Sequence, residues 1–262
     1  MRQTRYSITV PGLVKPRLAA VASDVHDQAR YGQRALEALA ESSPDLILIP
    51  GDLTEDIRDP SRYGFAFARA CAAIAPTYVS LGNHEIGGCH SSRPNPASLH
   101  VEADAVERYR ERLAGDGVCL LTNEWVLRDE LVIGGLSSGL ARDAEGTLRE
   151  SGPDLAFAGK MASLPGVKIL LCHQPEYYMQ DLFRYALDVT VAGHAHGGQI
   201  RLFGRGLYSP GQGLFPKWTR GLFRKGGEGC LAVSAGVSNN TGIPRLFNPT
   251  EIMLLQLCVP ET

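Results

Sequence analysis

Residues 187–200 read LDVTVAGHAHGGQI, and this stretch places two histidines directly after an apolar run of β type. The pair, His194 and His196, is enclosed by three glycines, Gly193, Gly197 and Gly198. Alternate residues of an extended backbone point the same way, so both imidazoles are expected to face one cavity. Glycine permits unusual backbone angles and close approach to neighbouring groups. The pair therefore indicates a binding loop, whose other participants must lie elsewhere in the chain.

Side chains that can bind a metal also follow four other apolar runs: RLAAVAS, DLILIP, PTYVSLG and VKILLC. The residues that follow them are Asp24 and His26, Asp52, Asn83 and His84, and His173. Loops at the carboxyl ends of strands form the sites of layered α/β folds, so these residues are expected to meet. Asp, Asn and His supply oxygen and nitrogen ligands for divalent metals, and the lack of thiolates among them disfavours a structural zinc site.

The order of patterns along the chain predicts an α/β fold. Near-continuous apolar runs indicate strands that are covered on both faces. Over the first two thirds of the chain, helical patterns alternate with them at residues 31–42, 61–75, 97–115 and 153–164. Beyond about Gly197 the sequence is richer in glycine, proline and strand-type residues. We find no internal repeat and no linker, and expect one domain over residues 1–262.

The five groups at the strand ends resemble the calcineurin-like metallophosphoesterase superfamily. The family pattern reads D-x-H, G-D, G-N-H-[DE], H and G-H-x-H, and this chain carries DVH, GD, GNHE, H and GHAH in the same order. Each group alone is a weak signal, but five in order, each after a strand, are specific. The resemblance spans Asp24 to His196 and implies two packed mixed β-sheets flanked by helices, a four-layer α-β-β-α fold.

The resemblance also implies a centre of two divalent metal ions about 3.5–4 Å apart. The implied ligands of the first ion are Asp24, His26 and His196, and those of the second are Asn83, His173 and His194. Asp52 is implied to bridge both ions. His84 is expected either to protonate the leaving oxygen or to stabilise charge on the phosphoryl group, while a metal-bridging hydroxide attacks phosphorus in line. Mixed nitrogen and oxygen ligands suit Mn, Fe, Zn or Co. Glu85 either orients His84 or is a local loop residue.

The activity implied by the resemblance is hydrolysis of phosphoester bonds. The run GDLTEDIRDP departs from the G-D-x-V-D-R-G pattern of protein Ser/Thr phosphatases. The segments GHAHGGQIRL and GIPRLFNPTEI resemble a YkuE-like branch of phosphodiesterases, which implies a lipid-linked or nucleotide-diphosphate-sugar-like substrate. A phosphodiesterase is therefore favoured, and a phosphomonoesterase is the close alternative. A non-catalytic metal-binding scaffold is a third alternative, disfavoured because every ligand position and His84 are filled.

The segment from Gly197 to Gly227 carries six basic residues, no acidic residue and several aromatic ones. Three of its residues are candidates for substrate binding: Arg201, Lys217 and Trp218. Basic and aromatic side chains together suit an anionic head group or a lipid interface. The alternative is that the apolar side chains pack against the second sheet while the charges stay solvated; these side chains are Phe203, Leu214, Phe215 and Leu222.

Composition limits the remaining classes of function. The net charge of −2 and the lack of a nucleic-acid motif give no reason to expect a nucleic-acid partner. No apolar run approaches the about 18–20 residues of a membrane span, and the start does not read as a signal peptide. The six cysteines are scattered, which is typical of reduced thiols. We expect a cytoplasmic location, with peripheral contact to a membrane or lipid as an additional expectation.

Overall fold

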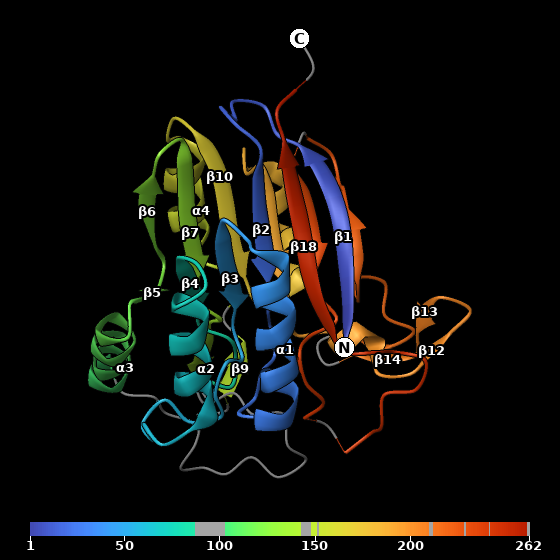
Figure 1. The fold of residues 1–262 in the computed structure, drawn as a ribbon. Helices are drawn as coiled ribbons and strands as arrows, with labels where there is room; N and C mark the ends of the chain where they lie inside the picture. The colour runs from blue at the N-terminus through green and yellow to red at the C-terminus, as the bar shows by residue number, and fades with distance from the viewer. Residues whose placement is uncertain are drawn as a thin grey trace.

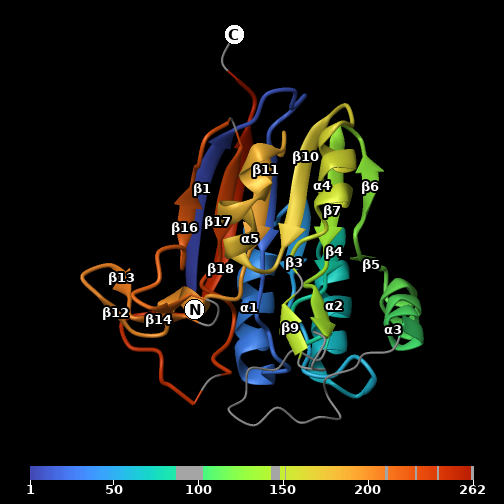
Figure 2. The ribbon, with the colours of Figure 1, turned by 180° about the vertical axis from the view of Figure 1, so that it is seen from behind.

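Two six-stranded β-sheets pack face to face, and helices cover the outer face of each sheet (Figure 1). The structure, a computed structural model, describes residues 1–86, 103–142, 148–150, 152–209, 212–227, 229–240 and 242–260. In Figure 1 the helices α1 and α2 lie in front of the first sheet, and in the reverse view of Figure 2 α4 and α5 lie in front of the second. The predicted four-layer α-β-β-α fold is thereby confirmed.

The first sheet combines a parallel block with two strands from the ends of the chain. Its members, in spatial order, are β1 (Arg2–Thr9), β18 (Glu251–Cys258), β2 (Arg17–Val21), β3 (Leu46–Pro50), β4 (Thr77–Ser80) and β5 (Val118–Leu121). Strands β2 to β5 are parallel, β18 runs antiparallel to β2, and β1 runs parallel to β18. The helices on this side of the molecule are α1 (Ala29–Ser42), α2 (Tyr63–Ala72) and α3 (Ala103–Gly115).

The second sheet has a parallel centre and antiparallel edges. Its members, in spatial order, are β16 (Gly221–Phe223), β17 (Cys230–Val233), β11 (Val189–Ala192), β10 (Val167–Cys172), β7 (Leu131–Leu136) and β6 (Glu124–Arg128). Only the pairs β16–β17 and β6–β7 are antiparallel within it. The helices on its outer face are α4 (Leu155–Ala162) and α5 (Pro175–Gln180), followed by the single turn η2 (Leu182–Arg184).

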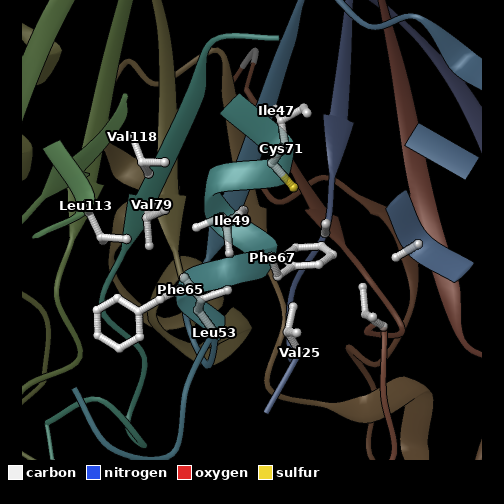
Figure 3. Close-up of a cluster of buried hydrophobic side chains, with 14 of the residues drawn as sticks. Val25, Ile47, Ile49, Leu53, Phe65, Phe67, Cys71, Val79, Leu113 and Val118 are labelled. Atoms are coloured by element: carbon white, nitrogen blue, oxygen red, sulfur yellow. The ribbon is translucent and has the colours of Figure 1, made fainter. Parts of the chain in front are cut away.

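Strand β3 shows why the apolar runs are continuous. Leu46 and Leu48 belong to the core between the sheets, whereas Ile47 and Ile49 belong to the core beneath the helices. Successive side chains of a strand point to opposite faces, so a strand buried on both faces must be apolar at every position. Figure 3 shows Ile47 and Ile49 with Phe67 of α2, in the helix-side core.

Between β11 and β16 the chain leaves the sheets and forms short ladders, which project from one side of the molecule (Figure 1). They are β12 (Arg201–Leu202) with β13 (Arg205–Gly206), and β14 (Tyr208–Ser209) with β15 (Gly213–Leu214). A separate short pair, β8 (Leu140–Arg142) with β9 (Leu148–Glu150), lies earlier in the chain, between β7 and α4. Phe203, Leu214 and Phe215 on this projection are exposed, while Leu222 packs into the core between the sheets. The sheet-packing alternative is therefore wrong for three of its four residues, because two-residue ladders bury no face.

Two expectations about composition can be compared with the described residues. The five cysteines that lie among them, Cys71, Cys119, Cys172, Cys230 and Cys258, are free thiols. None of the helices in the described ranges has the length and the apolar character that a membrane span requires.

Candidate metal centre

The strand-end loops bring the seven predicted ligands together at one edge of the two sheets. One group joins Asp24, His26 and His196, and a second joins Asp52, His173 and His194; within each, one ligand atom per residue lies within 4.8 Å of the others. Asn83 adjoins the second group, because its Oδ1 lies 3.0 Å from His173 Nε2. All seven residues are buried. His194 and His196 are close in sequence but belong to different groups. The metal-binding role of each of the seven residues stays a prediction.

Asp52 lies where a bridging ligand is expected. Its Oδ2 is 3.0 Å from His173 Nε2 in the second group and 3.7 Å from His26 Nε2 in the first. The same oxygen is 3.9 Å from Nε2 of His84, the predicted proton donor. Burial acts to raise the pKa of Asp52, but the surrounding imidazoles outweigh burial and hold this pKa well below its usual range. The Asp52 side chain is thus an anion between the two groups.

The backbone of the two histidine-bearing motifs is not extended, so the expectation from alternating side chains is wrong. Asp24 and His26 have φ of 56° and 50°, and His194 and His196 have φ of 63° and 44°. His196 begins the single turn η3 (His196–Gly198) rather than continuing β11. Residues other than glycine rarely adopt the left-handed region, and such strain gathers at functional sites. The side chains therefore converge through tight left-handed turns, which no sequence period shows.

Two glycines let the loops approach the carboxylates closely. A Cβ atom added at Gly82 would lie 2.2 Å from Oδ1 of Asp52, and one at Gly193 would lie 2.5 Å from Oδ2 of Asp24. Neither carboxylate can move without leaving its group, so both positions require glycine. The remaining histidines, His90 and His100, lie outside the described residues.

Glu55, which the sequence analysis missed, fixes the rings of two histidines. Nδ1 of His26 and Nδ1 of His84 each lie 2.7 Å from a carboxylate oxygen of Glu55. Burial acts to raise the pKa of Glu55, but the two histidines outweigh burial and lower it to about 2. An ionised carboxylate only accepts hydrogen bonds, so both rings donate from Nδ1 and turn Nε2 toward Asp52. A signal was present: an acidic residue three positions after Asp52.

Several donor atoms fit a divalent cation. Nε2 of His26 and Oδ2 of Asp24 are buried and have no hydrogen-bond partner among the described residues. Nδ1 of His173 donates to the Pro50 carbonyl at 2.8 Å, which directs Nε2 toward Asp52. A second partner that fixes the tautomer is the usual arrangement for a histidine ligand. Ligand atoms of His26, Glu55 and His84 also lie within 4.8 Å of one another, but hydrogen bonds to Glu55 already occupy Nδ1 of both rings.

Arg245, also missed, lies against the first group. Its guanidinium nitrogen Nη2 is 3.2 Å from His196 Nδ1 and also donates to the Ser238 carbonyl. Nε and Nη1 have no hydrogen-bond partner in the part of the chain that the structure describes. Burial lowers the pKa of Arg245 to about 10, so the side chain remains a cation at neutral pH. Arg245 lies 49 residues after His196 in the sequence, so no local sequence pattern links the two residues.

Glu85 does not orient His84, because Glu55 does so; instead it binds two loops together. Its carboxylate accepts backbone N–H groups of Gly82 at 2.8 Å, Asp52 at 2.9 Å, Leu53 at 2.6 Å and Thr54 at 3.0 Å. Burial and the Asp52 charge raise the pKa of Glu85, while these donors favour the ionised form. Of the two roles left open, that of a local loop residue is therefore correct.

Glu85→Gln is expected to destabilise the metal-free protein by on the order of 3 kcal/mol, because an amide group cannot accept at both ends and leaves buried donors unpaired. Urea unfolding followed by circular dichroism measures this change. Glu37→Gln, at an exposed position of α1, is the matched control. A Glu85→Gln variant as stable as this control would contradict the role assigned to the carboxylate.

The three candidate substrate-binding residues do not belong to either group, and of the three it is Arg201 that contacts the histidine turn. The Arg201 guanidinium donates to the Gly197 carbonyl at 2.8 Å and to the Thr219 hydroxyl at 3.0 Å, which secures the loop after His196. Arg201 also lines a cavity of about 630 Å³. Lys217 is exposed, and Trp218 is half-buried against the core beneath α4 and α5. Contact of these residues with substrate stays a prediction.

The model of the family described as calcineurin-like phosphoesterase matches residues 18–198, from β2 to the end of the second histidine pair. The chain belongs to this family. Membership implies a phosphoester hydrolase that uses divalent metals, which agrees with the donor groups described above. The YkuE-like branch stays a prediction.

Two relatives of this phosphoesterase are uncharacterized metallophosphoesterases of bacteria. The one from Campylobacter jejuni is 26% identical over 257 residues, which cover 95% of this chain and 61% of that protein. The one from Helicobacter pylori is 25% identical over 223 residues, which cover 85% of this chain and 53% of that protein. The chain thus spans little more than half the length of these relatives.

Solved structures agree with the fold. A crystal structure of a Thermus thermophilus protein has a TM-score of 0.52 at 11% identity and covers 85% of this chain and 90% of its own. The crystal structure of the phosphopantetheinyl hydrolase from Mycobacterium tuberculosis has a TM-score of 0.50 at 13% identity and covers 87% of this chain and 91% of its own. At these identities the likeness concerns the fold alone.

Proposed function

We propose that the chain is a phosphodiesterase that works with two divalent cations. The observation that carries the proposal is the pair of buried donor groups, which Asp52 of the second group joins through its contact with His26 of the first, with His84 beside the same carboxylate. Unpaired buried atoms at Asp24 and His26 support cation binding in the first group. Asn83 is proposed as an additional ligand of the second group, next to His173.

Divalent cations bound here would neutralise phosphoryl charge and lower the pKa of the attacking water. The side chains perform the remaining tasks. Asp52 offers a carboxylate to both groups and offsets the repulsion between two cations. His84, held at Nδ1 by Glu55, presents Nε2 toward the centre and donates a proton to the leaving oxygen. An alkoxide is a poor leaving group, so this proton matters most for unactivated esters.

The preference for a diester is supported by charge. Arg245 places one guanidinium, with two donors unpaired among the described residues, beside the first group. One cationic group matches the single negative charge of a phosphodiester. A lipid-linked or nucleotide-diphosphate-sugar-like substrate is proposed because the segment that follows the centre is basic and aromatic, with Arg201, Lys217 and Trp218 as contacts. A phosphomonoesterase remains the alternative that experiment must separate.

Removal of metal tests the proposal. Dialysis against a chelator is expected to abolish hydrolysis of bis-p-nitrophenyl phosphate, and Mn²⁺, Fe²⁺, Zn²⁺ or Co²⁺ is expected to restore it. Because ligands that bind only the folded state stabilise it, loading at about 100 times Kd should add roughly 2.7 kcal/mol to the free energy of unfolding. Full activity after complete metal removal would contradict the proposal. Faster turnover of p-nitrophenyl phosphate than of the diester would favour the phosphomonoesterase.

A further inference from the structure

Three phenylalanines on the side projection and the loop before β18 are exposed to solvent in an unfavourable backbone conformation. Phe203 is fully exposed, and Phe215 and Phe247 are 74% and 82% exposed. Their φ angles are 51°, 54° and 55°. A bulky residue in the left-handed region is an outlier, and an exposed ring gains nothing from the core. Neither local conformation nor packing within the chain accounts for phenylalanine at these turns.

Two of these turns lie together although they are far apart in sequence. Phe203 and Phe247 line the same cavity of about 630 Å³. Backbone hydrogen bonds join the two segments, because Arg201 donates to the Leu246 carbonyl at 2.9 Å. The six most exposed apolar residues of the projection and this loop are here named the apolar turn surface: Leu202, Phe203, Leu214, Phe215, Leu246 and Phe247. Apolar exposure on this scale marks an interaction surface.

Positive charge surrounds the apolar turn surface. The cavity beneath Phe203 and Phe247 is also lined by three arginines, Arg2, Arg201 and Arg220. Glu251 pairs with Arg220 at 2.7 Å and offsets its charge, so Arg2 and Arg201 supply the net positive charge of this cavity. The sequence between residues 197 and 227 has six basic residues and no acidic one. The partner that complements such a surface has an anionic outer layer and an apolar interior.

We propose that the apolar turn surface docks onto an anionic phospholipid membrane. Rings at the tips of turns enter the boundary between head groups and acyl chains, where aromatic side chains are favoured. The arginines remain at head-group level and are attracted by anionic lipid. A bilayer needs no shape complementarity, which suits apolar side chains carried on separate turns. The proposal concerns membrane contact alone and stands independently of the activity.

Docking would also set the orientation of the metal centre. Asn248, next to Phe247, donates from Nδ2 to the carbonyls of His196 at 2.7 Å and Gln199 at 3.2 Å. The loop that carries Phe247 is therefore fixed to the histidine turn itself. A membrane held by Phe203 and Phe247 would lie near the histidine turn, which suits a substrate that is itself embedded in lipid.

Cosedimentation with vesicles tests the docking. The wild-type chain is expected to sediment with phosphatidylcholine–phosphatidylglycerol vesicles, less with phosphatidylcholine alone, and less as salt rises. The double variant Phe203→Asn with Phe247→Asn is expected to lose at least about tenfold in partition coefficient, because two rings no longer enter the membrane. Asparagine tolerates the left-handed region, so the unfolding midpoint should be unchanged or raised. Hydrolysis of soluble bis-p-nitrophenyl phosphate should stay at the wild-type level.

Leu127→Asn is the matched control, since Leu127 is 71% exposed on β6 at the opposite edge of the second sheet from β16. This variant should sediment as the wild type does. Equal sedimentation of the double variant, or no binding of the wild type to anionic vesicles, would overturn the proposal. A wild-type dimer without lipid that the double variant converts to a monomer would also overturn it, because the surface would then be covered by a second copy.

Discussion

Asp52→Asn is expected to lower kcat for bis-p-nitrophenyl phosphate about a thousandfold, because one carboxylate faces both donor groups. Loss of several kcal/mol of charge stabilisation corresponds to that factor at about 1.4 kcal/mol per tenfold. The amide is neutral and offers one oxygen, so it cannot offset the repulsion between two cations. Metal analysis of the purified variant should show fewer bound ions per chain than the wild type.

The control for this substitution lies in the same loop. Asp56 pairs with Arg58 at 2.7 Å and takes no part in either donor group, so Asp56→Asn should keep nearly full activity. Circular dichroism must show that Asp52→Asn remains folded. Wild-type kcat in a folded Asp52→Asn protein would remove the bridging role from this residue.

His84→Ala is expected to lower kcat by about 10²–10⁴-fold, the usual contribution of a general acid, while the metal content stays that of the wild type. The substitution removes the proton donor but none of the predicted ligands. The loss should be larger for an alkyl phosphodiester than for a nitrophenyl diester, because nitrophenolate leaves without help. Kinetics with the two leaving groups on each variant measure this difference.

Glu55→Gln separates orientation from proton donation. Glutamine cannot hold both rings as the carboxylate does, so kcat should fall in the same direction as for His84→Ala, though less. Wild-type kcat in His84→Ala with both leaving groups would show that the proton comes from elsewhere. An equal loss with both leaving groups would assign His84 to stabilisation of phosphoryl charge instead.

The sequence alone predicted the layers of the fold, and six of the seven residues predicted as ligands fall into two close groups in the structure. Buried parallel strands carry apolar residues at every position, as in β3, or at all but one, as in β10 with Lys168, and these runs are easily found. β1 was missed because its sequence, RQTRYSIT, is mostly polar. This strand forms because it pairs with β18 over eight residues from the other end of the chain. Such long-range pairing leaves no local pattern.

The supporting side chains of the centre were harder to predict than its ligands. The ligands follow strands in short motifs, whereas Arg245 reaches His196 from a loop 49 residues further along the chain. Glu55 was overlooked because its partners, His26 and His84, lie on two different loops. The left-handed turns at Asp24 and His194 depend on contacts made only after the sheets have packed. Local sequence identifies the predicted ligands, and tertiary contact specifies their orientation.

The four backbone hydrogen bonds accepted by Glu85 have a practical consequence. They hold the loops after β3 and β4 in place through protein groups alone. On the proposed function, ions would depart and return while the loops around them keep their positions. A single batch of purified chain can be stripped once, divided and refilled with different metals in parallel. Which ion gives the highest activity then becomes a comparison within one preparation.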